Sequence, residues 1–413
     1  MTRPAWHSLT LATVTPMFLG KFTSMDPKQQ RGQIPFPVPS LRGVLAYWLR
    51  ALAGAHVGDD LARLAKAEAA VFGSARSADS VGSSPIWIRG SRPVGVKEFQ
   101  PSKYPIGYLM GPGLYGAMPA ARCVAGGRTI NLEVRNTGTS PQADLFLSAL
   151  WALRTFGGIG ARVRRGFGTI ALDGKPMTLP SERFQPEWLT RDSADDLTEV
   201  LSCVAGCLGD LGIPAGSTDD GQPGYPRFDL TGQWHTVASE PGITIPGAGS
   251  AEDALAWTSQ RLREFRLDCA GNDNTAGWRD IVRPYLNGSS SSSAEFRAGA
   301  LGLPVVYTEK ATRPGTDARS ATVEPVIGGQ PSRRASPLWL RVHGRGSTWK
   351  LRSLAFNATW LPDEGSGLHV KATKVKATKG VTRPARPVTP PSPDTIRGEL
   401  ERWFSYVEAH ASD

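Results

Sequence analysis

The sequence from residue 140 to residue 172 reads SPQADLFLSALWALRTFGGIGARVRRGFGTIAL. Its first half predicts a helix that begins at Ser140-Pro141, because apolar residues recur on one face, namely Leu145, Phe146, Ala149, Leu150 and Leu153. Phe167 to Leu172 predicts a strand. Between them, residues 157–168 hold five glycines and three arginines. This order of helix, loop and strand indicates an α+β fold with unusual chemistry concentrated in one loop.

The elements on the N-terminal side of this stretch continue the same arrangement. Residues 7–16 alternate apolar and hydroxyl side chains, which predicts a half-buried first strand. Ser40 occupies the N-cap position of the next helix, and Asp60 to Phe72 predicts an Ala-rich helical insertion. Short strands are predicted at 86–89 and 129–135. Without the insertion, the order is strand, helix, strand, strand, helix, strand, which is the ferredoxin-like βαββαβ arrangement.

The second half of the chain predicts a degenerate copy of this arrangement. A chain of 413 residues exceeds the usual span of one hydrophobic core. Extended segments are predicted at 228–238, 305–307, 338–342 and 349–360, with a helix over 251–268. We predict an α+β protein of two ferredoxin-like (RRM-like) domains with helical insertions, over residues 1–215 and 222–413. The second domain ends in a basic, Pro-rich segment, 371–393, and a terminal helix from Asp394 to His410.

Composition narrows the classes of partner, whereas the ferredoxin-like fold hosts too many activities to fix a function. Lys and Arg number 47 against 37 acidic residues, and the net charge of +10 favours a polyanionic partner. The four cysteines lack C-x-x-C spacing and the six histidines are scattered, so we expect no metal site and no cofactor. No stretch approaches the roughly 20 apolar residues that span a bilayer. We therefore expect a cytoplasmic protein without a membrane partner.

The loop at 157–168 has the composition of a phosphate-binding segment. Glycine permits positive φ and close approach of backbone amides to an anion, and arginine adds forked donors. A P-loop or dinucleotide loop is disfavoured, because these glycines follow a helix and precede a strand. The alternative is a Gly C-cap followed by solvated arginines. The predicted RNA-binding residues in this loop are Gly157, Gly158, Gly160, Arg162, Arg164, Arg165 and Gly166.

A second basic stretch surrounds the first loop and the first helix. Three cations follow the first strand, and the helix N-terminus after them attracts phosphate. Arg42 and Arg50 lie two turns apart and can address one ligand, while Gly43 allows another backbone to come close. An ordinary amphipathic helix with solvated arginines is the alternative. The predicted RNA contacts in this stretch are Lys21, Lys28, Arg31, Ser40, Arg42, Gly43 and Arg50.

Several segments together carry a family resemblance. They are Thr15-Pro-Met-Phe-Leu-Gly20, Pro39-Ser-Leu-Arg-Gly43 with Tyr47-Trp-Leu-Arg-Ala51, Gly157 to Gly168, Leu301-Gly-Leu-Pro304, and Arg333-Arg-Ala-Ser-Pro-Leu-Trp-Leu-Arg-Val342. In these segments the chain resembles the RAMP superfamily proteins of type III CRISPR systems. Within that superfamily it is most similar to the subunit family numbered one of the type III-B Cmr complex. The glycine- and arginine-rich loop is the specific motif.

This resemblance implies two RAMP domains in a non-catalytic RNA-binding subunit at one end of a helical ribonucleoprotein. The subunit would contact the 3′ part of guide RNA and the target RNA, beside other RAMP subunits, and Arg333 and Arg334 join the predicted contacts. Two alternatives stay open. Backbone subunits of these complexes cleave with an aspartate in the loop where Asp26 lies, so the chain could be an endoribonuclease. It could also be a scaffold without direct RNA contact, whose arginines bind acidic faces of neighbouring subunits.

Overall fold

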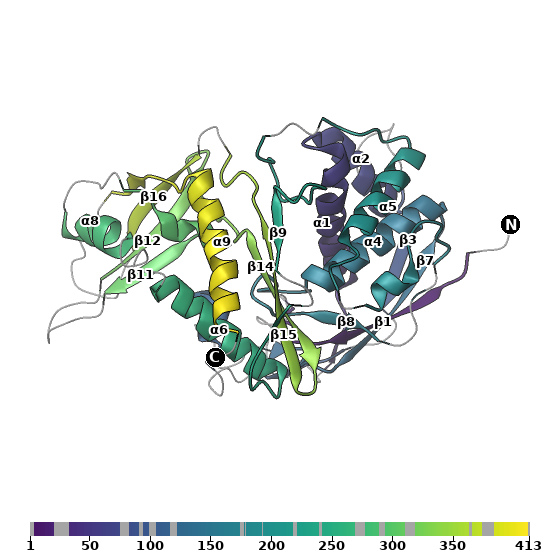
Figure 1. Ribbon diagram of the computed structural model, residues 1–413, viewed down its shortest axis with the longest axis horizontal. Coiled ribbons are helices and arrows are strands. Elements are labelled where there is room, and N and C mark those ends of the chain that lie inside the picture. The colour runs from purple at the N-terminus through teal and green to yellow at the C-terminus, as the bar shows by residue number, and fades with distance from the viewer. Residues whose placement is uncertain are drawn as a thin grey trace. The chain divides into compact units, whose positions relative to one another are not determined.

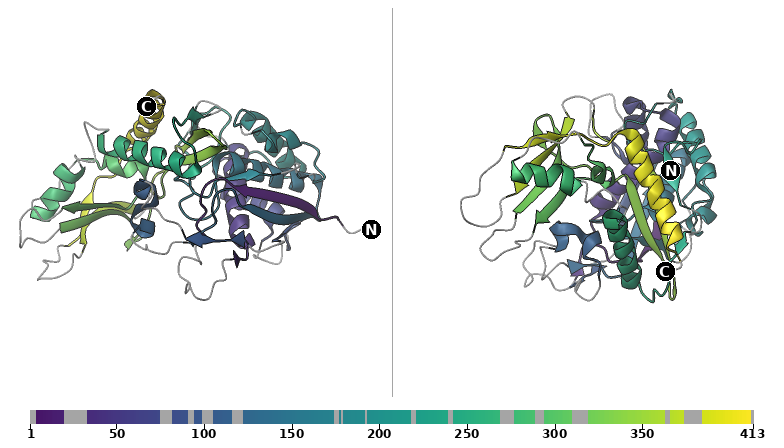
Figure 2. Two further views of the ribbon diagram at one scale, coloured as in Figure 1. Left: turned by 90° about the horizontal axis from the view of Figure 1, so that it is seen from below. Right: turned by 60° about the vertical axis from the view of Figure 1, so that its left-hand side comes forward.

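The structure is a computed structural model that describes two compact units of an α+β protein (Figure 1, Figure 2). The described residues are 4–19, 33–74, 82–90, 94–98, 105–115, 122–173, 177, 179–191, 193–217, 221–238, 242–268, 277–288, 294–309, 319–362, 366–373 and 384–411. The first unit comprises Met1–Gln260, Trp339–Phe356 and His410–Asp413. The second unit comprises Arg261–Leu338 and Asn357–Ala409. Both units combine helices with antiparallel strand pairs.

The first unit is built on a four-stranded antiparallel sheet in the order β3-β7-β1-β8. Its strands are β1 (His7–Thr13), β3 (Ile86–Gly90), β7 (Thr129–Asn136) and β8 (Ile170–Leu172). The register places Leu9 opposite Leu132 and Leu11 opposite Ile130, and all four side chains are buried. Ser8, between them in sequence, is exposed. The alternation predicted for the first strand is confirmed, because one face of the sheet forms the core and the other does not.

Four helices lie on the buried side of this sheet (Figure 1). They are α1 (Val38–Val57), α2 (Leu61–Phe72), α4 (Ser140–Phe156) and α5 (Leu197–Asp210). The short elements of the unit are β2 (Gln33–Ile34) paired with β4 (Val94–Gly95), β5 (Lys97–Glu98) paired with β6 (Arg122–Cys123), η4 (Pro186–Leu189), and α3 (Gly107–Tyr115), which is kinked at Gly111. The apolar residues of α1 and α4 contribute about a third of the buried residues of this core.

The sequence predicted the N-cap of α2 correctly but not that of α1. The Asp60 carboxylate accepts hydrogen bonds from the backbone N–H groups of Ala62 and Arg63, both at 3.0 Å, so the predicted start of the helical insertion is confirmed. The prediction that Ser40 caps α1 is wrong. The helix begins at Val38 after Pro37, and proline starts a helix through its fixed φ without a side-chain cap.

A hairpin from the C-terminal half completes the first unit. It consists of β14 (Leu338–Arg345) and β15 (Thr348–Phe356), in a sheet of order β10-β15-β14 with β10 (Ile243–Thr244), and β9 (His235–Val237) also pairs with β15. The ring of Trp339 lies 4.9 Å from that of Trp48, and the ring of Phe356 lies 5.0 Å from that of Phe228. The compact units therefore differ from the contiguous division predicted between 215 and 222, because aromatic burial joins 339–356 to the first core.

The second unit is built on a sheet of order β11-β12-β16-β17, with β13 paired to β12. Its strands are β11 (Val305–Glu309), β12 (Arg319–Ile327), β13 (Gln330–Pro331), β16 (Ser366–Thr373) and β17 (Arg386–Val388). Its helical elements are η5 (Gly277–Val282), α8 (Arg283–Asn287), η6 (Arg297–Leu301), α9 (Pro393–Ala409) and the end of α6 (Ala251–Asp268). None of the described helices is long and apolar enough to cross a membrane.

The predicted C-terminal helix is confirmed, and the structure describes part of the basic, Pro-rich segment 371–393 before it. The predicted terminal helix is present as α9, and its Trp403 packs edge-on against Phe265 of α6, with ring centroids 5.3 Å apart. Within the basic, Pro-rich segment 371–393, residues 371–373 belong to β16 and residues 386–388 form β17. Residues 374–383 lie outside the described residues.

The backbone of the first unit requires glycine at position 168, where the loop after α4 closes. Its φ is +68°, and an added Cβ would collide with the carbonyl oxygen of Ile159. Gly168→Ala is expected to lower the free energy of unfolding by about 3 kcal/mol, through left-handed strain and overpacking. Gly43 of α1 has nothing within 4 Å of an added Cβ, so Gly43→Ala is expected to raise it by about 0.5 kcal/mol. Urea denaturation measures both, and a Gly168→Ala protein as stable as wild type would contradict this account.

Candidate nucleic-acid interface

The glycine-arginine loop, residues 157–168, is closed by hydrogen bonds to itself and to the segment after β1. The N–H of Ile159 donates to the carbonyl oxygen of Gly168 at 2.9 Å. The N–H of Gly168 donates to the carbonyl oxygen of Pro16 at 2.9 Å, and the N–H of Ala161 donates to that of Phe18 at 2.8 Å. These bonds fix the loop between α4 and β8 and satisfy several of its backbone amides within the chain.

Two side chains secure the ends of the loop. The Thr15 hydroxyl donates to the carbonyl oxygen of Gly166 at 2.7 Å and accepts from the N–H of Thr169 at 3.0 Å. At the other end, the buried Arg352 of β15 donates to the carbonyl oxygen of Thr155 at 3.0 Å. Thr155 lies in the last turn of α4, where carbonyl groups lack helical partners and favour a cation. The loop therefore leaves the helix in a fixed direction.

The glycines of the loop serve close packing of the chain against itself. Gly157, Gly158 and Gly166 are buried. A Cβ on Gly157 would lie 2.5 Å from the indole nitrogen of Trp48, and one on Gly158 would lie 2.9 Å from a loop carbonyl oxygen. Gly160 has φ of +103° and faces a carbonyl oxygen of the neighbouring segment. The structure shows that these glycines allow neighbouring groups of the chain to approach closely. Their predicted contact with an RNA phosphate stays a prediction.

Arg162 lies at the exposed tip of the loop. Its φ is +64°, and it alone among the described non-glycine residues has a positive φ. Such a conformation costs about 1–2 kcal/mol and persists only where the surrounding structure imposes it. The guanidinium lies beside the kink of α3, since a Cβ on Gly111 would sit 3.4 Å from an Arg162 nitrogen. The loop thus presents one arginine outward in a conformation that is costly to hold.

Arg164 and Arg165 are more deeply placed than Arg162. The Arg164 guanidinium stacks over the ring of Trp339, 4.6 Å from its centroid, and lies 5.9 Å from that of Tyr47. Cation–π stacking of this kind fixes the arginine against the two aromatic rings. Arg165 forms a bridge with Leu340 and donates its N–H to the carbonyl oxygen of Arg162 at 2.8 Å. Both side chains are half-buried.

The arginines predicted on the first helix contact the neighbouring helix. Arg42 donates to the carbonyl oxygen of Phe72 at 2.5 Å, and so satisfies the C-terminus of α2. Arg50 forms an ion pair with Glu68 of α2, with an N–O distance of 2.6 Å. Ser40 and Gly43 are exposed. The two arginines therefore address two different groups of α2, and their part in RNA binding stays a prediction.

The remaining predicted residues are divided between the second unit and undescribed segments. Arg333 is exposed, whereas Arg334 donates to the carbonyl oxygen of Thr359 at 3.1 Å and pairs through its backbone with Leu303. Lys21, Lys28 and Arg31 lie outside the described residues, as does the alternative catalytic residue Asp26. The structure thus gathers Arg162, Arg164 and Arg165 in one loop and gives Arg334 a structural contact within the second unit.

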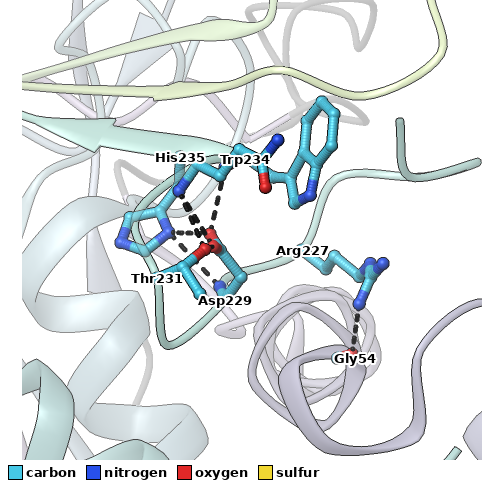
Figure 3. Close-up of polar contacts among 7 residues, drawn as sticks. Gly54, Arg227, Asp229, Thr231, Trp234 and His235 are labelled. Atoms are coloured by element: carbon cyan, nitrogen blue, oxygen red, sulfur yellow. Dashed lines mark hydrogen bonds and ion pairs between the residues drawn. The ribbon is translucent and has the colours of Figure 1, made fainter. Parts of the chain in front are cut away.

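A carboxylate–imidazole contact between Asp229 and His235 was not predicted from the sequence (Figure 3). His235 Nδ1 lies 2.7 Å from Asp229 Oδ1. The same carboxylate accepts hydrogen bonds from the N–H groups of Gln233 at 2.9 Å and Trp234 at 3.1 Å, and from the Thr231 hydroxyl. All of these partners lie in the turn that precedes β9 or at its first residue, His235. The carboxylate therefore orders this turn, as Asp commonly does by bonding backbone groups that follow it.

Arg227 connects the same segment to α1 (Figure 3). The buried Arg227 donates to the carbonyl oxygen of Gly54 at 3.1 Å, and its Nε lies 3.5 Å from a carboxylate oxygen of Asp59. Both partners lie at the C-terminal end of α1, where a cation is favoured by the helix dipole. The contact has a structural role in joining residues 227–235 to the first helix.

The Asp229 turn predicts a pH-dependent stability. Burial alone would raise the pKa of Asp229, but hydrogen bonds with His235 and Thr231 outweigh it and hold the pKa well below its usual range. Because the unfolded value is about 3.9, the carboxylate contributes stability fully above that pH and loses it as the pH falls through the lower folded-state pKa. Asp229→Asn is therefore expected to be less stable than wild type at neutral pH, with a difference that narrows in acid.

Urea denaturation of wild type and Asp229→Asn across this pH range measures that difference. The exposed Asp195→Asn is a matched control that removes one carboxylate outside the turn, and it is expected to stay close to wild type at neutral pH. A difference between Asp229→Asn and wild type that is independent of pH would show that the carboxylate charge is not what orders the turn.

In the described part of the chain, no group of three or more His, Cys, Asp or Glu side chains is placed to hold a metal ion. Cys123, Cys203 and Cys207 are buried and form no disulfide, in agreement with their prediction as buried thiols. Cys269 lies outside the described residues.

With this geometry in view, residues 10–171 match the RAMP superfamily, a range that runs from β1 through the glycine-arginine loop into β8. This range contains Thr15–Gly20, Pro39–Gly43 and the glycine-arginine loop, which are among the segments that carry the resemblance to RAMP proteins. Among characterised proteins, the chain is similar to the CRISPR system Cmr subunit Cmr1-1 of Pyrococcus furiosus, with 29% identity over 234 residues. That similarity covers 55% of this chain and 64% of the relative, so the chain matches somewhat less than two thirds of the relative's length.

The fold is similar to a crystal structure of Cmr1 from Pyrococcus furiosus in its apo form. The TM-score is 0.53 at 19% sequence identity, and the match covers 87% of this chain and 90% of that one. A weaker likeness, with a TM-score of 0.48 and 11% identity, covers 98% of this chain and 100% of a chain in a type III-B Cmr-beta structure bound to cognate target RNA. The crystal structure thus supports a shared fold over most of both chains.

Proposed function

We propose that this chain is a non-catalytic RNA-binding subunit of a type III-B CRISPR effector complex. It contacts the 3′ part of guide RNA, captures target RNA, or does both, at one end of the assembly. Its partners are the guide RNA, the target RNA and the other RAMP subunits, and it acts in the cytoplasm in antiviral defence. The RAMP match over 10–171 and the likeness to a Cmr subunit support this assignment.

The observation that carries the proposal is the exposed, left-handed Arg162 on a loop that the rest of the first unit holds rigid. A fixed loop loses little conformational entropy when RNA binds. Little of the binding free energy from its arginine–phosphate contacts is therefore offset by ordering of the loop. A guanidinium can bridge two phosphate oxygens, and contacts with phosphate carry no information about the base sequence. Sequence selection then belongs to base pairing between guide and target, and the protein supplies backbone contacts.

We also propose that both units are ferredoxin-like domains, the second one degenerate. In the first unit, the order β8-β1-β7-β3 sets the fourth strand beside the first, the first beside the third and the third beside the second. Together with α1 and α4 on one face, this is the order expected of a βαββαβ unit with extra elements inserted. In the second unit, the antiparallel sheet β11-β12-β16-β17 supports a reduced version of the same plan.

The loop arginines give a direct test of RNA binding. Arg162→Ala and the double variant Arg162→Ala/Arg165→Ala are expected to weaken binding of a single-stranded RNA about equally for all sequences. Each lost phosphate contact should also flatten the slope of log affinity against log salt by about 0.7. Fluorescence anisotropy over a salt series measures both quantities. Arg397→Ala, an exposed arginine of α9, is the matched control for loss of one positive charge.

The same titration separates RNA binding from the scaffold alternative. That alternative draws support from the internal contacts of Arg42, Arg50 and Arg334, which occupy these side chains within the protein. A scaffold would show weak RNA binding with the same salt slope in wild type and loop variants. In that case the loop would have to be assigned to contacts with neighbouring protein subunits.

The absence of catalysis is a separate expectation with its own test. Prolonged incubation of the purified chain with guide and target RNA and Mg²⁺ is expected to leave both RNAs intact, because the proposed contacts bind backbone without activating a nucleophile. Asp26→Ala is expected to behave as wild type does. Cleavage by wild type that disappears in Asp26→Ala would establish the endoribonuclease alternative.

A further inference from the structure

The face of the β3-β7-β1-β8 sheet that is turned away from the helices carries an unusual set of side chains. Trp87 of β3 stands opposite Arg135 of β7, and Arg89 stands opposite Glu133. Side chains that face each other across paired strands lie on the same side of a sheet. Ile86 is buried on the helical side, whereas Trp87 is 46% exposed. The outer face therefore presents a large aromatic ring next to two arginines.

These side chains form a ladder in which guanidinium groups alternate with indole rings. The Arg89 guanidinium lies 4.1 Å from the ring centroid of Trp6, which directly precedes β1. The Arg135 guanidinium lies 4.7 Å from the Trp6 centroid and 4.8 Å from that of Trp87. Arg135 is therefore flanked by two indoles, and Trp6 by two guanidinium groups. Each contact is of the cation–π type, and together they hold Trp87 in place.

The ladder has an unbalanced positive charge. Arg89 is paired with Glu133 at an N–O distance of 2.8 Å, and its side chain is 54% exposed. Arg135 makes no ion pair in the described part of the chain, and its Nε is buried without a hydrogen-bond partner. A buried guanidinium nitrogen without a partner is costly, and an anion nearby would offset that cost. The outer face thus carries one positive charge, that of Arg135, in excess of its negative charges.

We propose that this ladder, Trp6, Trp87, Arg89 and Arg135, is a stacking platform for a base of single-stranded RNA, a second RNA contact beyond the glycine-arginine loop. This inference rests on the proposed RNA-binding function. An exposed indole stacks with any base, and each such contact adds substantially to the affinity for single strands. The phosphate next to the stacked base lies in reach of the unpaired charge of Arg135 and of the exposed Arg89.

The surroundings favour RNA over a protein partner for this face. Around the ladder, the outer sides of β1 and β7 carry the polar residues Ser8, Thr10 and Asn131. A protein interface would place an apolar core around its aromatic anchor, and the described residues next to the ladder form no such core. A flat polar sheet with one exposed indole and spare positive charge instead matches the needs of a stacked base and its phosphate.

The platform and the loop lie at opposite edges of one sheet. Trp87 belongs to the edge strand β3, and the loop leads into the other edge strand, β8. Three strand spacings amount to about 14 Å, which a few nucleotides of extended RNA can bridge. One RNA strand can therefore contact both surfaces, and the two contacts would reinforce each other by effective concentration.

The test compares Trp87→Ala with Trp87→Phe in the full-length chain, using a fluorescently labelled oligouridylate and anisotropy. Trp87→Ala is expected to lower the affinity by roughly 5- to 150-fold, the range for loss of one stacked base, while Trp87→Phe keeps most of it. Unlike the arginine variants, Trp87→Ala should leave the salt slope unchanged, because it removes no phosphate contact. Equal affinity of Trp87→Ala and wild type would overturn the platform.

A second measurement locates the base directly. Photo-cross-linking of wild type with iodouridine-substituted oligouridylate, followed by mass spectrometry, is expected to modify the peptide that carries Trp87. Cross-links found only in other peptides would overturn the platform, as would a Trp87→Ala protein that loses thermal stability but no RNA affinity.

If Arg162→Ala weakens binding while Trp87→Ala does not, the proposed function stands and the platform fails. If wild type does not bind oligouridylate, guide RNA or target RNA, both fail.

Discussion

The hydrogen bonds between the segment after β1 and the glycine-arginine loop are the constraint on which the first unit depends. They require backbone to approach backbone at Gly158, Gly160 and Gly168, where any side chain would intrude. Because the loop is fixed in this way, Arg162 is held in an unfavourable left-handed conformation at its tip. Rigid backbone and an exposed guanidinium are two results of one packing arrangement.

Arginine has several distinct roles in this protein, and its charge alone does not distinguish them. Arg352 satisfies the end of α4 and Arg42 the end of α2, while Arg164 lies flat on Trp339. Arginines at the surface of fixed elements, such as Arg162 and Arg89, can meet a polyanion without removing a contact that satisfies a helix end. The excess of basic residues is thus shared between internal architecture and the solvent-facing surfaces.

Much of the first unit could be predicted from the sequence, because its signals are local. Alternation in β1, the Asp60 cap and the apolar face of α4 each specify an element without help from distant residues. The position of β14 and β15 could not be predicted, since it depends on Trp339 meeting Trp48 across most of the chain. The glycines of the loop could be recognised from the sequence, but the close packing that they allow could not, because composition alone does not specify which backbone groups meet. The Asp229 turn had a usable signal in Asp229-Leu-Thr-Gly232, whose residue types favour turns.

The interleaving of the two units has a consequence for biosynthesis. The ribosome releases α1, with Trp48, long before Trp339 and Phe356 emerge to cover it, and strands of the second unit appear in between. Loop-closure entropy grows only slowly with separation, so the delay costs little at equilibrium. It matters kinetically, because the aromatic surface around Trp48 stays uncovered in the nascent chain until residues 339–356 have been synthesised. The core of the first unit can therefore be completed only after most of the second unit has left the ribosome.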